Sequence, residues 1–130
     1  MADRVPTPTE IRLNRAERRL DVSFDDGSSF RLPAEYLRVE SPSAEVQGHG
    51  PGQKTLVSGK REVGIMSVEP VGHYAIRILF DDLHDTGIYS WETLYRLGRE
   101  YDTRWPEYEA ALAAQGLSRD LRGKAGKGRG

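Results

Sequence analysis

His84 is the residue of this chain best suited to chemistry, because it stands in an acidic turn, DDLHD, between Asp82 and Asp85. An imidazole titrates near neutral pH and carboxylates orient its ring, so the three could complete a weak metal site or move a proton. In the structural alternative, the imidazole hydrogen-bonds across the turn, and the aspartates form the turn and cap backbone groups. The spacing of a calcium-binding loop is missing, which favours the structural alternative.

No other group of residues has the spacing of a catalytic or cofactor site. A nucleophile, a base and an orienting group do not occur at recognisable spacing, so we expect no catalytic residues. The sequence has no cysteine, which excludes disulfides, thiolate metal sites and cysteine nucleophiles. The glycine-rich stretch from Gly48 to Lys54 lacks the Gly-Lys-Ser/Thr ending of a phosphate-binding loop, so we interpret it as an ordinary flexible loop.

Composition narrows the classes of partner. The 130 residues carry a net charge of −1, with 30% charged and 37% hydrophobic residues, so they generate no basic field of the size that binds nucleic acid. The five basic residues in the last twelve, RDLRGKAGKGRG, are expected to be solvated rather than to bind nucleic acid specifically. The sequence shows neither a secretory signal nor an apolar run of about 18 residues, so we expect a cytoplasmic protein with no membrane partner.

Alternating apolar residues predict two β-hairpins. A period of two places side chains on one face of a strand. Ile11 and Leu13 predict a first strand. The first hairpin has the same period on both sides of a tight turn at 25–28, with Leu20, Val22 and Phe24 before the turn and Phe30 and Leu32 after it. The second hairpin is predicted from 62–71 and 74–80, with one face formed by Tyr74, Ile76, Ile78 and Phe80. Between them we expect one helical turn at 33–37 and a long loop at 41–59 with a short strand around Val46.

Two helices are predicted after the hairpins. Ser90 has the side chain of an N-cap, and Gly98 would end the first helix. Thr103 would cap the second helix, with Pro106 in its first turn and an end near Gly116. A core-facing stripe on this helix is predicted from the spacing of Trp105, Tyr108 and Leu112. Of the other aromatic residues, Tyr36 and Tyr89 are expected to be partly exposed.

These elements predict an α+β fold: a small, mostly antiparallel β-sheet assembly with two C-terminal helices. We expect a single domain over residues 10–116. A flexible arm would precede it at 1–9, and a disordered basic tail would follow it at 117–130.

Three stretches of sequence carry a family resemblance. They are Leu32-Pro33 with Tyr36-Leu37-Arg38, then 41–46 (SPSAEV) with Gly48-His49-Gly50, and above all 84–98. Together they resemble the N-terminal domain of gamma-butyrobetaine hydroxylase and the small bacterial proteins similar to it. The likeness covers about residues 8–115.

The resemblance also implies what this chain lacks. In the hydroxylases the domain holds a structural zinc through a C-x-C-x-x-C run and one histidine; the run aligns with Ser41, Ser43 and Val46, and His84 fits the histidine. Two hydroxyls and an isopropyl group cannot replace thiolate ligands, so we expect no zinc and no other cofactor. The iron- and oxoglutarate-binding catalytic domain has no counterpart in 130 residues, so hydroxylase activity is not implied.

The function that we expect is therefore that of a non-catalytic accessory or adaptor domain that binds a protein partner. Related domains are fused to Mrp-type ATPases that act as scaffolds for iron–sulfur cluster assembly, so the resemblance implies a possible partner of that kind. The candidate binding surface consists of Arg38, Ser41, Ser43, His49, Asp82, His84, Asp85 and Tyr89. Two alternatives stay open: a metal-binding module that uses His84, His49 and nearby carboxylates, and a small enzyme. The sequence carries no signal for an oligomeric state.

Overall fold

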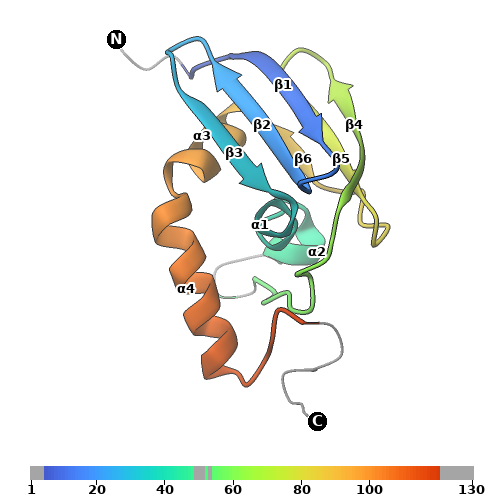
Figure 1. Ribbon diagram of the computed structural model, residues 1–130, viewed down its shortest axis with the longest axis vertical. Helices are drawn as coiled ribbons and strands as arrows, with labels where there is room; N and C mark the ends of the chain where they lie inside the picture. Colours follow the sequence, from blue (N-terminus) through green and yellow to red (C-terminus); the bar gives the residue numbers. More distant parts are fainter. Residues whose placement is uncertain (1–4, 49–51, 53, 121–130) are drawn as a thin grey trace.

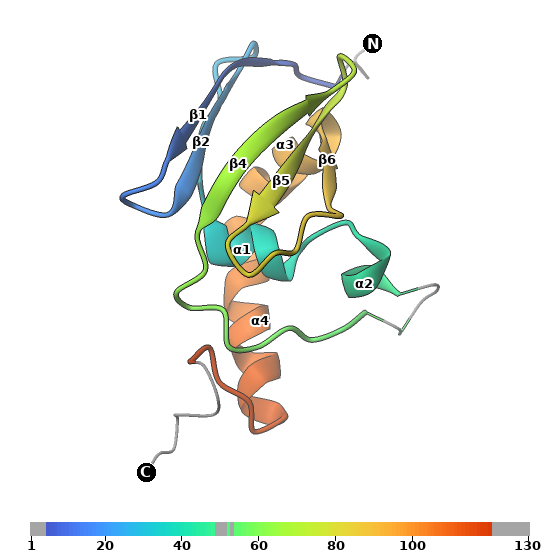
Figure 2. The ribbon, with the colours of Figure 1, turned by 90° about the vertical axis from the view of Figure 1, so that its right-hand side faces the viewer.

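Two three-stranded antiparallel sheets face each other, and the helices pack beside and below them (Figure 1; Figure 2). This computed structural model describes residues 5–48, 52 and 54–120. The first sheet has the order β1-β2-β3 and the second the order β4-β5-β6. The α+β fold class predicted from the sequence, with two helices at the C-terminal end, is confirmed.

The first sheet consists of the predicted hairpin and the strand predicted from Ile11 and Leu13. It consists of β1 (Pro8–Asn14), β2 (Arg19–Phe24) and β3 (Ser29–Pro33). At the β2–β3 turn, Gly27 has a φ of 90° and the Asp26 side chain accepts a hydrogen bond from the Ser28 N–H at 2.9 Å. Glycine adopts this backbone conformation without steric cost. Strand β1 begins at Pro8, two residues before the expected start of order at Glu10.

The second sheet contains the second predicted hairpin and a short third strand. Its strands are β4 (Ile65–Val71), β5 (Ala75–Phe80) and β6 (Ile88–Ser90). Ile76, Ile78 and Phe80 line the inner face as predicted, whereas Tyr74 lies before the strand and is 60% exposed. The β4–β5 register shifts between Ile65 and Ser67, which is the mark of a β-bulge.

The core fills the space between the sheets and is closed by two helices. Its fully buried side chains come from both sheets, from α1 (Ala34–Val39) and from α3 (Trp91–Arg99). The largest of them are Tyr36, Tyr89, Phe80, Leu20, Leu32, Leu37, Ile78, Leu94 and Leu97. A second, smaller cluster consists of Val39, Tyr108 and Leu112, and joins α1 to α4 (Tyr101–Ala114).

The helices confirm some predicted boundaries and correct others. Ser90 caps α3 as predicted, since its side chain accepts a hydrogen bond from the Thr93 N–H at 3.1 Å. Val46 lies in a short helix, α2 (Ala44–Gln47), so the predicted strand there is wrong. Helix α4 starts at Tyr101, which places Thr103 and Pro106 inside it. Thr103 is therefore not the cap, and Pro106 is not in the first turn.

Gly98 does not end α3, contrary to prediction, but permits a close contact inside it. The helix continues to Arg99, and a Cβ at position 98 would overlap the Phe30 ring on β3. The Phe30 ring also packs edge-on against Phe24 and Tyr95. Glycine is needed here for space and not for a turn.

Residues 117–120 belong to the ordered part of the chain, although the sequence predicted a disordered tail from 117. The carbonyls of Ser118 and Arg119 accept hydrogen bonds from the N–H groups of Gly59 and Arg61, both at 2.9 Å. The Arg119 guanidinium binds the buried Glu35 carboxylate through two hydrogen bonds of 2.7 and 2.8 Å, and stacks on Trp105. The rest of the predicted tail lies outside the described residues. Within the described part of the chain, no helix is long and apolar enough to cross a membrane.

Gly98→Ala should destabilise the fold. Helix propensity alone favours alanine over glycine by about 1 kcal/mol, but the overlap with Phe30 should cost about 1–3 kcal/mol and outweigh that gain. The measurement is the free energy of unfolding in urea. Adding Phe30→Ala should reduce the effect of Gly98→Ala, and a more stable Gly98→Ala single variant would contradict the overlap.

Candidate functional site

The turn from 81 to 87, between β5 and β6, lies against the segment from 41 to 47. The Ser41 Oγ is 3.0 Å from His84 Nε2, and the Ser43 Oγ is 2.7 Å from the Thr86 Oγ1. Each of these two contacts joins residues that are 43 positions apart in the sequence. Of the positions that align with the family's zinc ligands, the structure brings Ser41, Ser43 and His84 together, and it buries Val46 beside them in α2.

Small residues allow this close approach. The Ser43 side chain caps α2 by accepting a hydrogen bond from the Glu45 N–H at 3.1 Å, and its own N–H donates to Ser41 Oγ at 3.2 Å. On the facing turn, a Cβ at Gly87 would lie 2.5 Å from Ser41 Oγ. The turn and the α2 segment are therefore in contact with no room for a further side chain at position 87.

Glu45 is the residue of this site that the sequence interpretation missed. Its Oε1 lies 3.0 Å from His84 Nδ1, so the imidazole sits between Ser41 and Glu45. Because a carboxylate only accepts hydrogen bonds, neutral His84 carries its proton on Nδ1, and Nε2 accepts from the Ser41 hydroxyl. The sequence marks Glu45 only by its place two residues after Ser43, which caps α2.

The order serine, histidine, carboxylate is that of hydrolase triads, but the burial of the serine gives it a structural role. Ser41 is 0% exposed, and its oxygen already accepts the Ser43 N–H. A nucleophile needs space for a substrate next to its oxygen. The hydrogen bonds therefore hold the turn against α2 and supply no reactive group to solvent.

The charge state of His84 follows from the same surroundings. Burial lowers its pKa below 6.5, and the positive charge of Arg38 lowers it further, against the opposing effects of Glu45 and Asp82. The imidazole is therefore neutral at physiological pH, in agreement with the hydrogen bonds that it makes.

The residues present do not fit a zinc ion. Zinc requires about four nitrogen, sulfur or carboxylate donors in a tetrahedron. Here the aligned positions supply two hydroxyls and the Val46 isopropyl group, and both nitrogens of His84 are engaged within the protein. Among residues 5–48, 52 and 54–120, no three His, Cys, Asp or Glu side chains gather in a way that could hold a metal.

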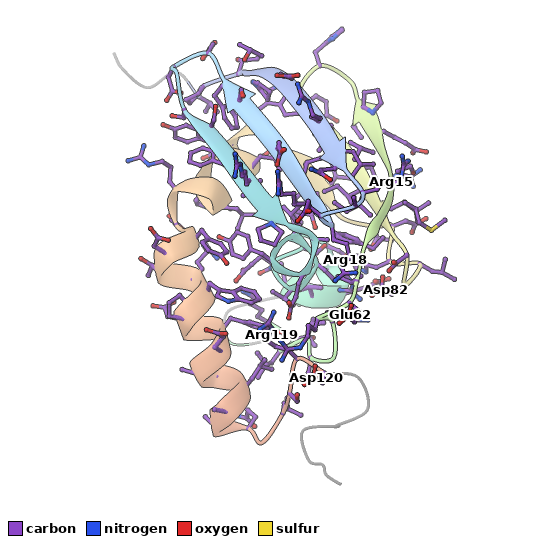
Figure 3. All side chains as sticks on the ribbon, in the orientation of Figure 1. Arg15, Arg18, Glu62, Asp82, Arg119 and Asp120 are labelled. Atoms are coloured by element: carbon purple, nitrogen blue, oxygen red, sulfur yellow. The ribbon has the colours of Figure 1, made fainter. Side chains whose placement is uncertain are left out.

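Asp82 connects the turn to α1 and to the segment before β4. Its Oδ2 binds Arg38 Nε at 2.8 Å and Lys60 Nζ at 2.6 Å, and its Oδ1 accepts from the His84 N–H. Burial acts to raise the Asp82 pKa, but the hydrogen bonds from Lys60, His84 and Arg38 outweigh it and lower the pKa to about 2. Figure 3 shows Asp82 near Glu62 and Arg18, and the latter two form an ion pair of 3.1 Å.

Tyr89 is not a surface residue, contrary to prediction, and neither is Tyr36. Both are 0% exposed. The Tyr89 hydroxyl donates to the Leu37 carbonyl at 2.6 Å, and the Tyr36 hydroxyl donates to the Leu97 carbonyl at the same distance. Each bond satisfies a carbonyl in the last turn of a helix, where no intrahelical donor is available.

The candidate surface is therefore largely internal. Ser41, Ser43 and His84 are buried, Arg38 and Asp82 are paired with each other, and Asp85 is about half exposed and 4.0 Å from Arg77. His49 lies outside the described residues. The exposed large apolar side chains here are Leu83 in the turn and Ile88 at the start of β6, which the sequence interpretation did not select.

Tyr89→Phe should lower the free energy of unfolding by about 1–3 kcal/mol, because it leaves the buried Leu37 carbonyl without a donor. Urea denaturation measures the change. The control is Tyr74→Phe, which alters an exposed ring and should change stability by less than about 0.5 kcal/mol. Equal effects of the two substitutions would contradict the assigned role of Tyr89.

Stability should also fall as the pH drops below 6.5, the value expected for a histidine in the unfolded chain. The His84 pKa is lower in the folded state, so the unfolded state binds the proton more readily, and the stability present above pH 6.5 is lost on acidification. Urea denaturation between about pH 7.5 and pH 5 should show this slope in the wild type and in the exposed-histidine control His73→Gln. His84→Gln should flatten it; an unchanged slope in that variant would assign the effect to other groups.

Comparison with known proteins agrees with this architecture. Residues 11–95 match the family described as gamma-butyrobetaine hydroxylase-like, N-terminal. Two proteins with NMR solution structures are similar to the chain: one is 46% identical with a TM-score of 0.79, covering 90% of this chain and 92% of that one, and the other is 44% identical with a TM-score of 0.79, covering 100% and 98%. None of the curated proteins compared with the chain matches it.

A crystal structure is also similar: a DUF971-family protein of unknown function from Acidithiobacillus ferrooxidans. It is 42% identical with a TM-score of 0.60, and the match covers 71% of this chain and 92% of that one. The matched family segment runs from β1 into α3 and contains the whole Ser41–His84–Glu45 site. The chain therefore belongs to the gamma-butyrobetaine hydroxylase-like N-terminal domain family.

Proposed function

We propose that this protein is a non-catalytic accessory domain that binds a protein partner through the exposed side of its β5–β6 turn. Leu83 is the observation that carries the proposal. It is 74% exposed, and its φ of 72° lies in the left-handed region that leucine rarely adopts. Both features are unfavourable for the isolated fold, and such strained residues cluster at functional sites.

Two further apolar side chains lie at the same end of the second sheet. Met66 lies in the β-bulge opposite Phe80, and Ile88 lies on β6 opposite Arg77; both are 46% exposed. Of the six large hydrophobic residues exposed in the described part of the chain, these three share one end of one sheet. We call Met66, Leu83 and Ile88 the turn surface. Clustered apolar side chains surrounded by polar ones favour a protein contact.

The buried residues beneath support this proposal, because they fix the turn that carries Leu83. Leu83 donates its N–H to the Phe80 carbonyl, and the Phe80 N–H donates to the His84 carbonyl, so the turn is closed by the backbone on both sides. Below it, His84 and Asp82 connect to α2 and α1 through the contacts with Ser41 and Arg38. A rigid turn presents Leu83 with little loss of conformational freedom on binding.

The partner that we propose is a protein of iron–sulfur or related metal-cofactor metabolism, with an Mrp-type iron–sulfur carrier as the first candidate. The family resemblance supports this choice. The chain has no cysteine and would act by contacting the carrier rather than by holding a cluster itself.

Isothermal titration with a purified Mrp-type carrier from the same organism tests the proposal. The wild type should bind, and Ile88→Asp should raise the dissociation constant about tenfold or more, as loss of an interface anchor does. Leu83→Gly is the sharper variant. Glycine accepts a φ of 72° without strain, so this substitution should not strain the fold, and loss of the leucine side chain should weaken binding.

The matched control is Tyr74→Ser, which removes an exposed ring next to the β4–β5 hairpin. It should leave the affinity unchanged. No binding of the wild type would contradict the carrier as partner, and equal effects of Tyr74→Ser and Leu83→Gly would contradict the turn surface as the contact.

A further inference from the structure

A small hollow with polar walls lies between α3, the start of α4 and the segment from 40 to 47. Its volume is about 210 Å³, and none of its lining residues belongs to the turn surface. We call it the polar hollow. Pockets for drug-sized ligands measure roughly 300 to 1,000 Å³, so the polar hollow suits a smaller ligand.

Three side chains that line the polar hollow have hydrogens left to donate. The Gln47 amide on α2 gives one N–H to the Ser41 carbonyl at 2.8 Å and has a second one. The Thr93 hydroxyl on α3 accepts from Ser90 Oγ at 3.0 Å, so its own hydrogen is available to a ligand. The Arg96 side chain, one turn further along α3, makes no hydrogen bond or ion pair with any residue that the structure describes. Donors from two helices therefore converge on one small space.

A carboxylate also lines the polar hollow, that of the buried Glu40. Both of its cationic partners bind the same oxygen, Oε1: Lys54 Nζ at 2.7 Å and Arg104 Nη1 at 3.1 Å. These two contacts compensate the negative charge of Glu40. The other oxygen, Oε2, makes no hydrogen bond with a described residue, so it can accept one from a ligand. The walls thus offer several donors and one strong acceptor.

We propose that the polar hollow binds inorganic phosphate. At neutral pH this anion keeps at least one P–O–H group, so it accepts hydrogen bonds and also donates one. Its unprotonated oxygens would accept from Arg96, Thr93 and Gln47, since a guanidinium binds phosphate oxygens well. Its hydroxyl would donate to Glu40 Oε2. Sulfate has the same tetrahedral shape but no hydrogen, so it would place a negative oxygen against the Glu40 carboxylate.

The test is an NMR titration of the ¹⁵N-labelled full chain at neutral pH and constant ionic strength, with sodium phosphate as the probe. Phosphate should cause saturable shifts of the amide signals of Gln47, Thr93 and Arg96. Sulfate should bind at least about tenfold more weakly, because it loses one hydrogen bond and meets a like charge. Methyl phosphate, whose dianion has no P–O–H group, should also bind more weakly, which distinguishes the free ion from a phosphate ester as ligand.

Arg96→Gln should raise the dissociation constant for phosphate about tenfold, as expected for the loss of a charged hydrogen bond. The control is Arg31→Gln, since Arg31 is also exposed and has no side-chain partner among the described residues; it should bind phosphate as the wild type does. Glu40→Gln should remove the preference for phosphate over sulfate, because an amide can donate a hydrogen bond to either ion.

Three results would each overturn the proposal. They are the absence of saturable shifts with phosphate, equal binding of sulfate or methyl phosphate by the wild type, and equal effects of Arg96→Gln and Arg31→Gln. Arg96 and Arg31 are both exposed, so these two variants test the site even if Glu40→Gln does not fold. None of these measurements involves the protein partner, so their outcome is independent of the proposed function.

Discussion

Buried carbonyl groups at the ends of short helices place the strongest constraint on this fold. Helix α1 has only six residues and is enclosed by the core; the Glu40 and Ser41 N–H groups satisfy the Tyr36 and Arg38 carbonyls, but the buried Leu37 carbonyl needs a donor from elsewhere. The Tyr89 hydroxyl satisfies the Leu37 carbonyl, and the Tyr36 hydroxyl on α1 does the same for Leu97 on α3. Two phenols thereby fix α1 to β6 on one side and to α3 on the other. The face-to-face sheets depend on this, because α1 closes the core below them.

The Ser41–His84–Glu45 site extends the same constraint. The resemblance implies that hydroxylase relatives join these two segments through a metal ion. In this chain the segments are joined by hydrogen bonds between Ser41 and His84 and between Ser43 and Thr86. Such bonds are directional and short, and burial of His84 favours the neutral imidazole that accepts from Ser41. The buried polar residues therefore support the turn, and Leu83 stays exposed on it.

The sequence was sufficient for the parts of the fold that follow from local periodicity. Alternation at Leu20, Val22 and Phe24 predicted the first hairpin, and Ser90 before an apolar-periodic run predicted the start of α3; both signals lie within a few residues of what they determine. The family motif correctly placed Ser41 and Ser43 near His84. Some failures are local, such as the strand expected around Val46 and the start of α4, and the others depend on distant residues.

The residues next to a tyrosine in the sequence do not show which distant carbonyl its hydroxyl will bind. Tyr36 and Tyr89 were therefore expected to be partly exposed, although both are buried. Gly98 has the pattern of a helix end, whereas its reason is Phe30 on a strand 68 positions earlier. The partner of the buried Glu35, Arg119, is 84 residues away.

This last separation also has a consequence for biosynthesis. Helix α1 leaves the ribosome long before Arg119 is made, and until then the Glu35 carboxylate has no guanidinium to neutralise it. The contact between Glu35 and Arg119 can therefore form only after residue 119 has been made, which is later than every strand of the two sheets.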